Sequence, residues 1–234
     1  MKSREFSIIP VRMGNSNAYL VIGADITFLV DAGVHGHIHN LETTLFNNGL
    51  DFQDIDFIII THSHYDHVGN LGEIKKRSFA RILAHVNESE FLKEGYMPIP
   101  KGTSPFSNVI SWMANSFSSS RIRYNPVTPD ILVGGNCELL TGGEVKILTA
   151  PGHTSGSICV IVNNIYAIVG DTLFNIFKNC FYPLFVDDEK TLIKTWDKLL
   201  CTGCETFYPG HGKPVLLEEF HECFCKISKH HYRY

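Results

Sequence analysis

The sequence predicts a mixed α/β sandwich, and three observations favour this fold class. Short apolar, β-branched runs bounded by Gly, Pro, Asn or Asp recur along the chain, which is typical of strands. Stretches with apolar residues at helical spacing lie between these runs. The chain has 234 residues, 44% hydrophobic and 19% charged, so it can bury a substantial core. We therefore expect a single domain over residues 1–234 in which strands and helices interleave.

Eight of the apolar runs are expected to be strands. Two of them are separated only by Asn163 and Asn164, and this connection suits a tight hairpin because Asn tolerates positive φ. The expected strands are Ala18–Ile22, Ile26–Val30, Phe57–Ile60, Ile82–Ala84, Val145–Leu148, Ile158–Val162, Tyr166–Val169 and Thr206–Tyr208.

Five stretches are expected to be helices. The clearest starts at an Asp187 or Asp188 N-cap and places its apolar side chains on one stripe. Two others end before Gly49 and Gly95, which are favourable C-terminal stops. The expected helices are Leu41–Asn48, Asn87–Glu94, Val109–Phe117, Asp188–Leu200 and Leu217–His230.

The segment of residues 96–135 differs from the rest in being rich in Ser, Pro, Asn and aromatic residues. A long segment of this kind is either a functional cover or a poorly ordered excursion, and its apolar content favours a cover over the substrate. Aromatic residues after the later strands, Phe177, Phe181 and Tyr182, are candidate pocket residues, with core packing as the alternative. Lys178 is a candidate contact for an anionic substrate, with a solvated lysine as the alternative.

Composition restricts the partners and the compartment. The chain has 20 Lys and Arg against 24 Asp and Glu, so it lacks the basic surface that nucleic acids require. No apolar run is long enough to span a membrane, and the charged N-terminus argues against a signal peptide. Seven cysteines, an odd number, indicate reduced thiols. We expect a cytoplasmic protein with a small-molecule substrate and no nucleic-acid or membrane partner; a homo-oligomer remains open.

Histidine is the unusual component, and its positions follow a pattern. Four of the expected strands are each followed by a glycine-containing loop that carries His or Asp. Strand ends at one edge of a sheet converge, and imidazole and carboxylate groups bind Zn, Fe or Mn. Seven ligands are too many for one tetrahedral ion, whereas two ions that share a carboxylate use them all. The candidate ligands are His62, His64, Asp66, His67, His153, Asp171 and His211.

These motifs resemble the metallo-β-lactamase superfamily. The chain has H-x-H-x-D-H, a distant Gly-His, a Gly-Asp and a terminal Gly-His, and residues 17–19 and 30–33 resemble the N-terminal strands of that family. The resemblance implies a four-layer αββα sandwich with a dinuclear metal site at one edge of the sheets. It also implies a role for each ligand: His62, His64 and His153 hold one ion, Asp66, His67 and His211 hold the other, and Asp171 bridges them. Asp31 and Thr61 resemble positions that orient ligands.

Two bound ions would supply a bridging hydroxide at neutral pH, with Asp66 as the catalytic residue that orients or deprotonates the water. The expected reaction is therefore hydrolysis, with zinc as the first choice of metal and iron or manganese as alternatives. Two other functions remain open on the same fold. One is a mononuclear iron sulfur dioxygenase, against which the complete second ligand set argues. The other is a non-catalytic metal-containing sensor, against which the absence of any lost ligand argues.

Departures from subfamily patterns restrict the substrate. The best-known β-lactamases have Cys where Asp171 stands, and flavodiiron members have Glu where His64 stands. The remaining resemblance is to the glyoxalase II and lactonase-like group, whose substrates are thioesters or lactones. Only 23 residues follow His211, so the helical domain that contacts glutathione in glyoxalase II is not expected. We expect a small thioester, lactone or related ester as substrate.

Overall fold

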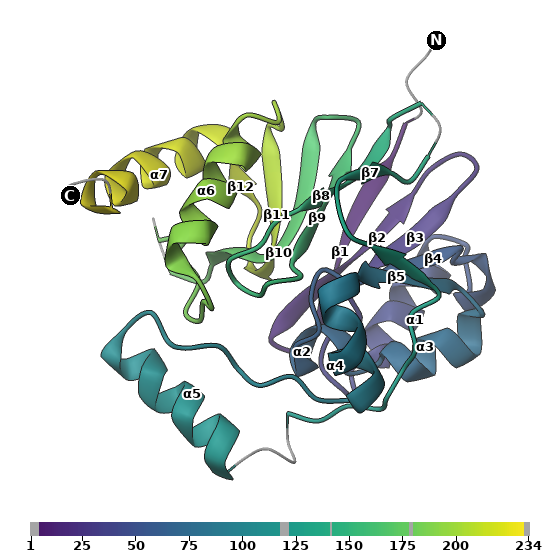
Figure 1. The fold of residues 1–234 in the computed structure, drawn as a ribbon. Helices are drawn as coiled ribbons and strands as arrows, with labels where there is room; N and C mark the ends of the chain where they lie inside the picture. Colours follow the sequence, from purple (N-terminus) through teal and green to yellow (C-terminus); the bar gives the residue numbers. More distant parts are fainter. Residues whose placement is uncertain (1–4, 118–121, 141, 178–179, 232–234) are drawn as a thin grey trace. The chain divides into compact units, whose positions relative to one another are not determined.

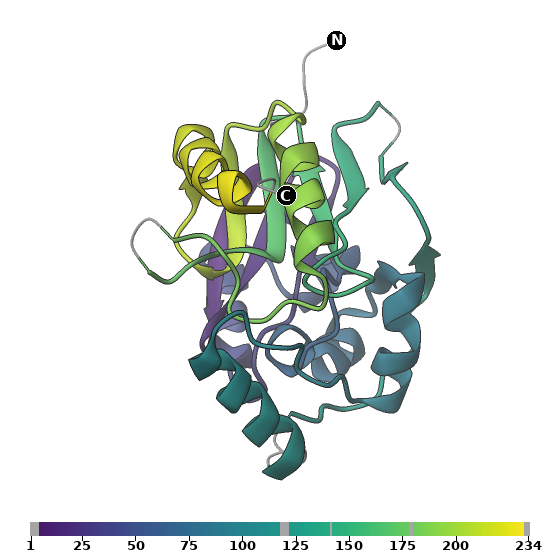
Figure 2. The same cartoon turned by 60° about the vertical axis from the view of Figure 1, so that its left-hand side comes forward.

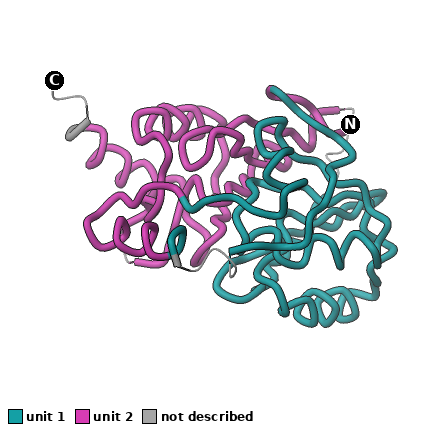
Figure 3. The backbone as a smooth tube through the Cα atoms, turned by 60° about the horizontal axis from the view of Figure 1, so that its bottom comes forward, with its two compact units in different colours: residues 1–99, 114–134 teal, residues 100–113, 135–234 magenta. Residues whose placement is uncertain are grey.

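The structure is a computed structural model that describes residues 5–117, 122–140, 142–177 and 180–231. The chain divides into two compact units, shown in different colours in Figure 3. Unit 1 comprises residues 1–99 and 114–134, and unit 2 comprises residues 100–113 and 135–234. Each unit contains one six-stranded sheet with its own helices and hydrophobic core.

The sheet of unit 1 runs in the order β1-β2-β3-β4-β5-β6 (Figure 1). The pairs β1–β2 and β2–β3 are antiparallel, and β3 to β6 pair in parallel. The parallel pairing places the carboxyl ends of β3 and β4 at the same edge of the sheet, which positions the residues that follow them. The strands are β1 (Ser7–Met13), β2 (Ser16–Ile22), β3 (Thr27–Val30), β4 (Phe57–Ile59), β5 (Arg81–His85) and β6 (Ile131–Val133).

Helices of unit 1 pack on this sheet through apolar side chains at helical spacing. Leu41 and Leu45 of α1, and Leu71 and Ile74 of α3, are buried against sheet residues such as Ile58. The helices are α1 (Ile38–Asn47), α2 (Tyr65–Val68), α3 (Leu71–Ser78) and α4 (Ser89–Glu94), with 3₁₀ turns at Phe52–Asp54 and Val86–Glu88.

The sheet of unit 2 runs in the order β12-β11-β10-β9-β8-β7, and β10 and β11 are its parallel pair. The hairpin between β9 and β10 is confirmed: Asn163 and Asn164 have φ of 55° and 54°, as a tight primed turn requires. The strands are β7 (Cys137–Glu138), β8 (Val145–Thr149), β9 (Ile158–Val162), β10 (Tyr166–Asn175), β11 (Thr206–Gly212) and β12 (Val215–Leu216).

Helices α6 (Glu189–Leu200) and α7 (Leu217–His231) belong to unit 2, and Figure 2 shows them in green and yellow beside its sheet. Asp188 is the N-cap of α6, and its side chain accepts a hydrogen bond from the Thr191 amide. Helix α5 (Pro105–Phe117) begins in unit 2 and ends in unit 1. No helix in the described ranges has both the length and the apolar character needed to cross a bilayer.

Trp196 is the centre of the unit 2 core. Its side chain is fully buried between Tyr182 and Phe220, whose ring centroids lie 5.7 and 5.2 Å away, and its Nε1 donates to the Thr172 carbonyl at 2.7 Å. We expect Trp196→Ala to lower the free energy of unfolding by about 3–5 kcal/mol, because it leaves a large cavity. The matched control is Trp112→Ala on α5, where the side chain is 60% exposed and the expected change is below about 0.5 kcal/mol. Urea unfolding of both variants tests this, and equal losses would contradict it.

Candidate metal centre

Unit 1 gathers four of the seven candidate ligands just after β4. His62 and His64 lie in the short connection to α2, and Asp66 and His67 lie on α2 itself. The ring centroids of His62 and His64 are 4.7 Å apart, and those of His62 and His67 are 4.2 Å apart. All four side chains are buried. Burial of imidazole and carboxylate groups costs free energy unless they are hydrogen-bonded or coordinate a metal ion.

Asp31, the residue that follows β3, holds this cluster in place through hydrogen bonds of its carboxylate. Its carboxylate accepts hydrogen bonds from the Thr61 amide and from the Thr61 hydroxyl, both at 2.8 Å. Its Oδ2 also lies 2.8 Å from Nδ1 of His67. Asp31 adopts a left-handed conformation with φ of 63°, which is uncommon outside glycine and typical of functional sites. The carboxylate thus fixes both the loop after β4 and the ring of His67.

These contacts assign the tautomers that metal binding requires. The Thr61 hydroxyl donates its hydrogen to Asp31. Its oxygen lies 3.1 Å from Nδ1 of His62 and therefore accepts a hydrogen bond from a protonated Nδ1. With Nδ1 protonated in His62 and His67, each Nε2 carries the lone pair that a metal ion binds. The expected roles of Asp31 and Thr61 as orienting residues fit this geometry.

A buried acid that the sequence did not reveal holds the same loop from another element. Glu88, in the 3₁₀ turn after β5, is fully buried, and its carboxylate accepts from the Ser63 amide at 2.9 Å and from the Ser63 hydroxyl. Ser63 lies between His62 and His64, so Glu88 fixes the backbone that carries both imidazoles. In the sequence, Glu88 appears as one of several acids at the start of a solvated helix, and nothing there indicates burial.

We expect Glu88→Ala to destabilise unit 1 and to loosen this loop. The variant leaves the buried Ser63 amide without its acceptor, at a cost of about 1–3 kcal/mol, and leaves the Ser63 hydroxyl only the weak acceptor Sδ of Met97, at 3.2 Å. Urea unfolding measures the loss. Glu90→Ala is the control, since the Glu90 side chain is 75% exposed and its removal is expected to change stability by less than about 0.5 kcal/mol. A Glu88 variant as stable as the control would contradict the role of Glu88.

Unit 2 carries the other three candidate ligands, and His153 is the first of them. It follows β8, and its Nδ1 lies 2.8 Å from the Phe185 carbonyl, which makes Nδ1 the protonated nitrogen. The preceding Gly152 has φ of 138°, and a side chain there would place Cβ 2.5 Å from the Leu192 Cα. Glycine is therefore required for the loop to pass the start of α6 and to deliver His153.

Asp171 and His211 lie on the neighbouring strands β10 and β11. Oδ2 of Asp171 is 3.5 Å from Nε2 of His153 and 3.5 Å from Nε2 of His211. All three side chains are buried. One carboxylate oxygen thus lies between two imidazole nitrogens, which is a suitable arrangement for a carboxylate that shares a metal site with each of them.

One expectation about these two residues is wrong. The sequence predicts that Asp171 and His211 lie on loops after their strands, but β10 continues to Asn175 and β11 to Gly212. The parallel pairing of the two strands shifts in register between Ile168 and Gly170 and again between Gly170 and Phe174. Asp171 therefore lies in an irregularly paired part of β10, and not on a loop after the strand.

The donor chemistry of the two units fits divalent metal ions. Unit 1 supplies three imidazoles and one carboxylate, and unit 2 supplies two imidazoles and one carboxylate. Three of the imidazoles have Nδ1 fixed by an acceptor, which leaves Nε2 for coordination. Among the described residues, no group of potential metal ligands includes a cysteine.

The candidate substrate residues are in different environments. Phe181 is buried in the unit 2 core, and Tyr182 packs on Trp196 while its hydroxyl donates to Glu189 at 3.0 Å. Phe177 is 57% exposed. Lys178 lies outside the described residues. The contribution of these residues to a substrate pocket stays a prediction.

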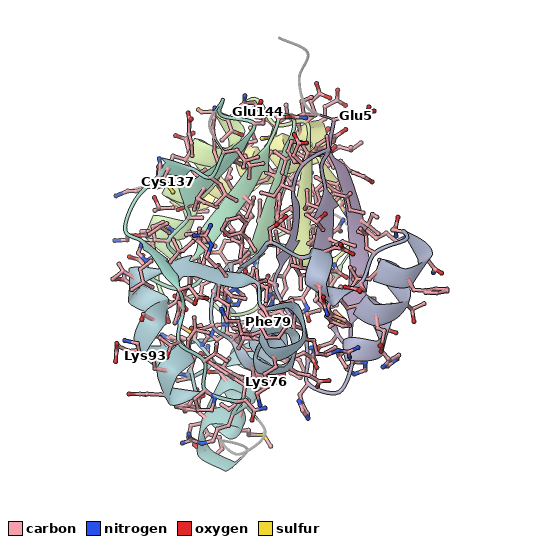
Figure 4. The ribbon with its side chains drawn as sticks, turned by 90° about the vertical axis from the view of Figure 1, so that its right-hand side faces the viewer. Glu5, Lys76, Phe79, Lys93, Cys137 and Glu144 are labelled. Atoms are coloured by element: carbon pink, nitrogen blue, oxygen red, sulfur yellow. The ribbon has the colours of Figure 1, made fainter. Side chains whose placement is uncertain are left out.

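Three of the cysteines are buried, and burial controls their reactivity. Burial raises the pKa of the Cys159 thiol to about 12 and also raises the pKa of Cys204 and Cys223, so these thiols stay protonated at neutral pH. We expect iodoacetamide to label the exposed Cys180 and Cys201 in the native protein and to spare these three. Cys137, exposed on β7 (Figure 4), should react slowly because desolvation raises its pKa. Peptide mass spectrometry before and after denaturation tests this, and rapid native labelling of Cys159 would contradict it.

Comparison with known proteins places these features in a family. Residues 11–211 match the model of the metallo-beta-lactamase superfamily. A probable metallo-hydrolase of Methanocaldococcus jannaschii, MJ0888, is 31% identical over 165 residues, 68% of each chain. The human acyl-coenzyme A thioesterase MBLAC2 is 27% identical over 156 residues, 62% of this chain and 53% of the relative.

The fold is also found in solved structures. The metallo-beta-lactamase family protein TTHA1429 of Thermus thermophilus is similar with a TM-score of 0.71 at 23% identity, over 97% of this chain and 79% of that one. The predicted fold class, the αββα sandwich, is thereby confirmed. From the family match and these relatives, we conclude that the chain belongs to the metallo-beta-lactamase superfamily and is a metal-dependent hydrolase.

Proposed function

We propose that the chain is a dinuclear hydrolase of small thioesters, lactones or related esters. In this proposal, His153, Asp171 and His211 of unit 2 complete the ligand set that unit 1 supplies, as the resemblance to the family implies. The observation that carries it is the Asp171 carboxylate between His153 and His211, because a bridging ligand needs such a position. Zinc suits the mixed imidazole and carboxylate set, with iron or manganese as alternatives.

The residues of the chain have separate tasks in the reaction. Metal ions held by these ligands would lower the pKa of water, supply a hydroxide nucleophile and polarise the carbonyl of the substrate. Asp66, buried on α2, would orient this water and accept its proton. Asp31 and Thr61 hold His67 and His62 in the tautomers described above, which fixes the geometry before substrate binds. Burial of the ligands keeps competing water away and strengthens the electrostatic interactions of the site.

Support for an ester or thioester substrate comes from a relative and from the charge of the chain. The human relative is named an acyl-coenzyme A thioesterase. The net charge of −4 disfavours a nucleic-acid substrate, which requires an extended basic surface. We propose a small-molecule substrate, with residues 96–135 contributing to its selection, and a cytoplasmic enzyme as the seven cysteines indicate.

A substrate panel tests this function. The protein, purified without chelator, is assayed on acyl-coenzyme A thioesters, lactones and simple phosphate esters, with a chelated sample and Asp66→Asn as controls. We expect chelator-sensitive hydrolysis of a thioester or a lactone, with a large loss in Asp66→Asn. Hydrolysis of phosphate esters alone would overturn the substrate class. Oxygen consumption with a persulfide, without hydrolysis of any ester, would identify a dioxygenase instead.

A further inference from the structure

Helix α5 exposes apolar side chains that the metal site does not use. This helix, drawn in teal in Figures 1 and 2, has the sequence PFSNVISWMANSF and contains no charged residue. Of the large apolar side chains that are exposed among the described residues, five lie on this helix. They are Phe106 at 75%, Val109 at 55%, Ile110 at 38%, Trp112 at 60% and Met113 at 51% exposed.

The polar side of the helix is turned to the protein. Ser107 and Ser111 are buried, and the Ser111 hydroxyl donates to the Pro100 carbonyl at 2.7 Å. One turn further on, the Asn115 side chain bonds both the amide and the carbonyl of Ile99 at 2.9 Å. These residues recur every fourth position, so they form one stripe that ties the helix to the segment before it. The hydrogen bonds therefore hold the apolar face outward.

The exposed face of α5 carries the apolar residues that an amphipathic helix normally buries. Phe106, Val109, Ile110 and Met113 follow the spacing i, i+3, i+4 and i+7, which places them on one face of the helix. In most soluble proteins such a face is buried, and a contiguous exposed apolar patch marks an interaction site. Trp112 beside it adds an aromatic ring of the kind that prefers the boundary between lipid and water.

The charge around this helix indicates the partner. Residues 95–129 contain Lys101, Arg121 and Arg123 and no Asp or Glu, a local charge of +3 in a chain whose net charge is −4. Lys101 is exposed just before the helix, and the guanidinium of Arg123 lies 4.8 Å over the Tyr96 ring. An uncharged helix with an exposed apolar face, which basic residues precede and follow in the sequence, complements an anionic lipid surface.

We propose that α5 is an interfacial helix that adsorbs on anionic phospholipid surfaces through Phe106, Ile110 and Trp112. This differs from the expectation of no membrane partner, which was based on the lack of a spanning segment. Adsorption buries apolar side chains at the lipid boundary, while Lys101, exposed just before the helix, meets the phosphate groups. Although α5 lies within residues 96–135, adsorption can be measured without any ester substrate, so its failure and the failure of the proposed hydrolysis are distinguishable.

The two tryptophans give a direct readout of adsorption. Trp196 is fully buried, whereas Trp112 is exposed, so a shift in emission on adding vesicles reports on α5. The protein is titrated with vesicles of phosphatidylcholine alone and of phosphatidylcholine with phosphatidylglycerol, and bound protein is also measured by sedimentation. We expect a blue shift and co-sedimentation with the anionic vesicles only, weakened by added salt. The shift should be lost in Trp112→Phe while sedimentation is largely retained.

Surface variants distinguish adsorption through α5 from nonspecific binding to lipid. Phe106→Ser/Ile110→Ser is expected to weaken binding by at least roughly tenfold, because each apolar side chain buried contributes more than about 1 kcal/mol. Phe46→Ser is the matched control, an aromatic residue 80% exposed on α1, and it should bind as the unchanged protein does. The proposal would be overturned if the protein bound neither kind of vesicle. It would also be overturned if the double variant and Phe46→Ser lost the same amount of binding. Concentration-dependent self-association without lipid, abolished by the double variant, would assign this face to a second copy instead.

Discussion

Asp171→Ala is expected to abolish hydrolysis and to lower the metal content, while the protein stays folded. The Oδ2 atom of Asp171 lies 3.5 Å from both His153 and His211, so its removal leaves these two imidazoles without the carboxylate between them. Loss of residues that only orient a metal ligand typically costs 10–100-fold in affinity or activity. Loss of the proposed bridging ligand is therefore expected to lower kcat/KM by more than about a hundredfold. Elemental analysis and kinetics measure both effects.

Two further variants make this result specific. Asp197→Ala removes an exposed acid from α6 of the same unit, and activity and metal content should be unchanged. Asp171→Asn keeps the shape of the side chain but weakens it as a ligand, so it should behave like the alanine variant rather than the control. Circular dichroism confirms that each variant is folded. A folded Asp171→Ala protein with full activity would rule out the dinuclear mechanism.

Asp31→Asn is expected to produce the second largest effect, although Asp31 is not itself among the proposed ligands. Asparagine tolerates the left-handed backbone at this position, where φ is 63°, so the variant tests the carboxylate and not the fold of the turn. Its amide nitrogen cannot accept from Nδ1 of His67 or from the Thr61 hydroxyl, which disturbs both ligand tautomers. We expect metal affinity to fall about 10–100-fold.

Metal competition titrations with a chromophoric chelator measure this affinity without reference to turnover. Asp25→Ala, an exposed acid just before β3, is the control and should bind metal normally. The activity of Asp31→Asn should recover in part when excess metal is supplied, because Asp31 orients ligands and does not contact the substrate. An affinity equal to that of the unchanged protein would show that the imidazoles are oriented by other contacts.

Much of the fold follows from patterns that sequence can display. The β9–β10 hairpin depends on two asparagines whose positive φ a tight turn requires, and the start of α6 depends on the Asp188 cap. β1 gives no such signal: it lies at the edge of the sheet, is only partly buried and contains Pro10. Proline has no amide hydrogen to donate to a neighbouring strand, so it is tolerated mainly in edge strands. A run that contains proline is therefore not recognised as a strand from the sequence.

The candidate site was predictable to a different degree in its parts. The His and Asp residues occur in short motifs beside apolar runs, so their association is visible in the sequence. The role of Glu88 was not visible, because its burial against Ser63 depends on a contact across 25 residues and its neighbours are ordinary helix-forming acids. The shifts in register of β10 against β11 were also hidden, since they depend on pairing between strands.

The metal content of protein purified without chelator tests the proposed dinuclear centre most directly. Elemental mass spectrometry gives the identity of the metal and its ratio to protein in one experiment. The seven buried ligands and the position of Asp171 predict about two equivalents of zinc, iron or manganese per chain, and fewer in Asp171→Ala. A single equivalent of iron, unchanged in Asp171→Ala, would contradict the dinuclear hydrolase.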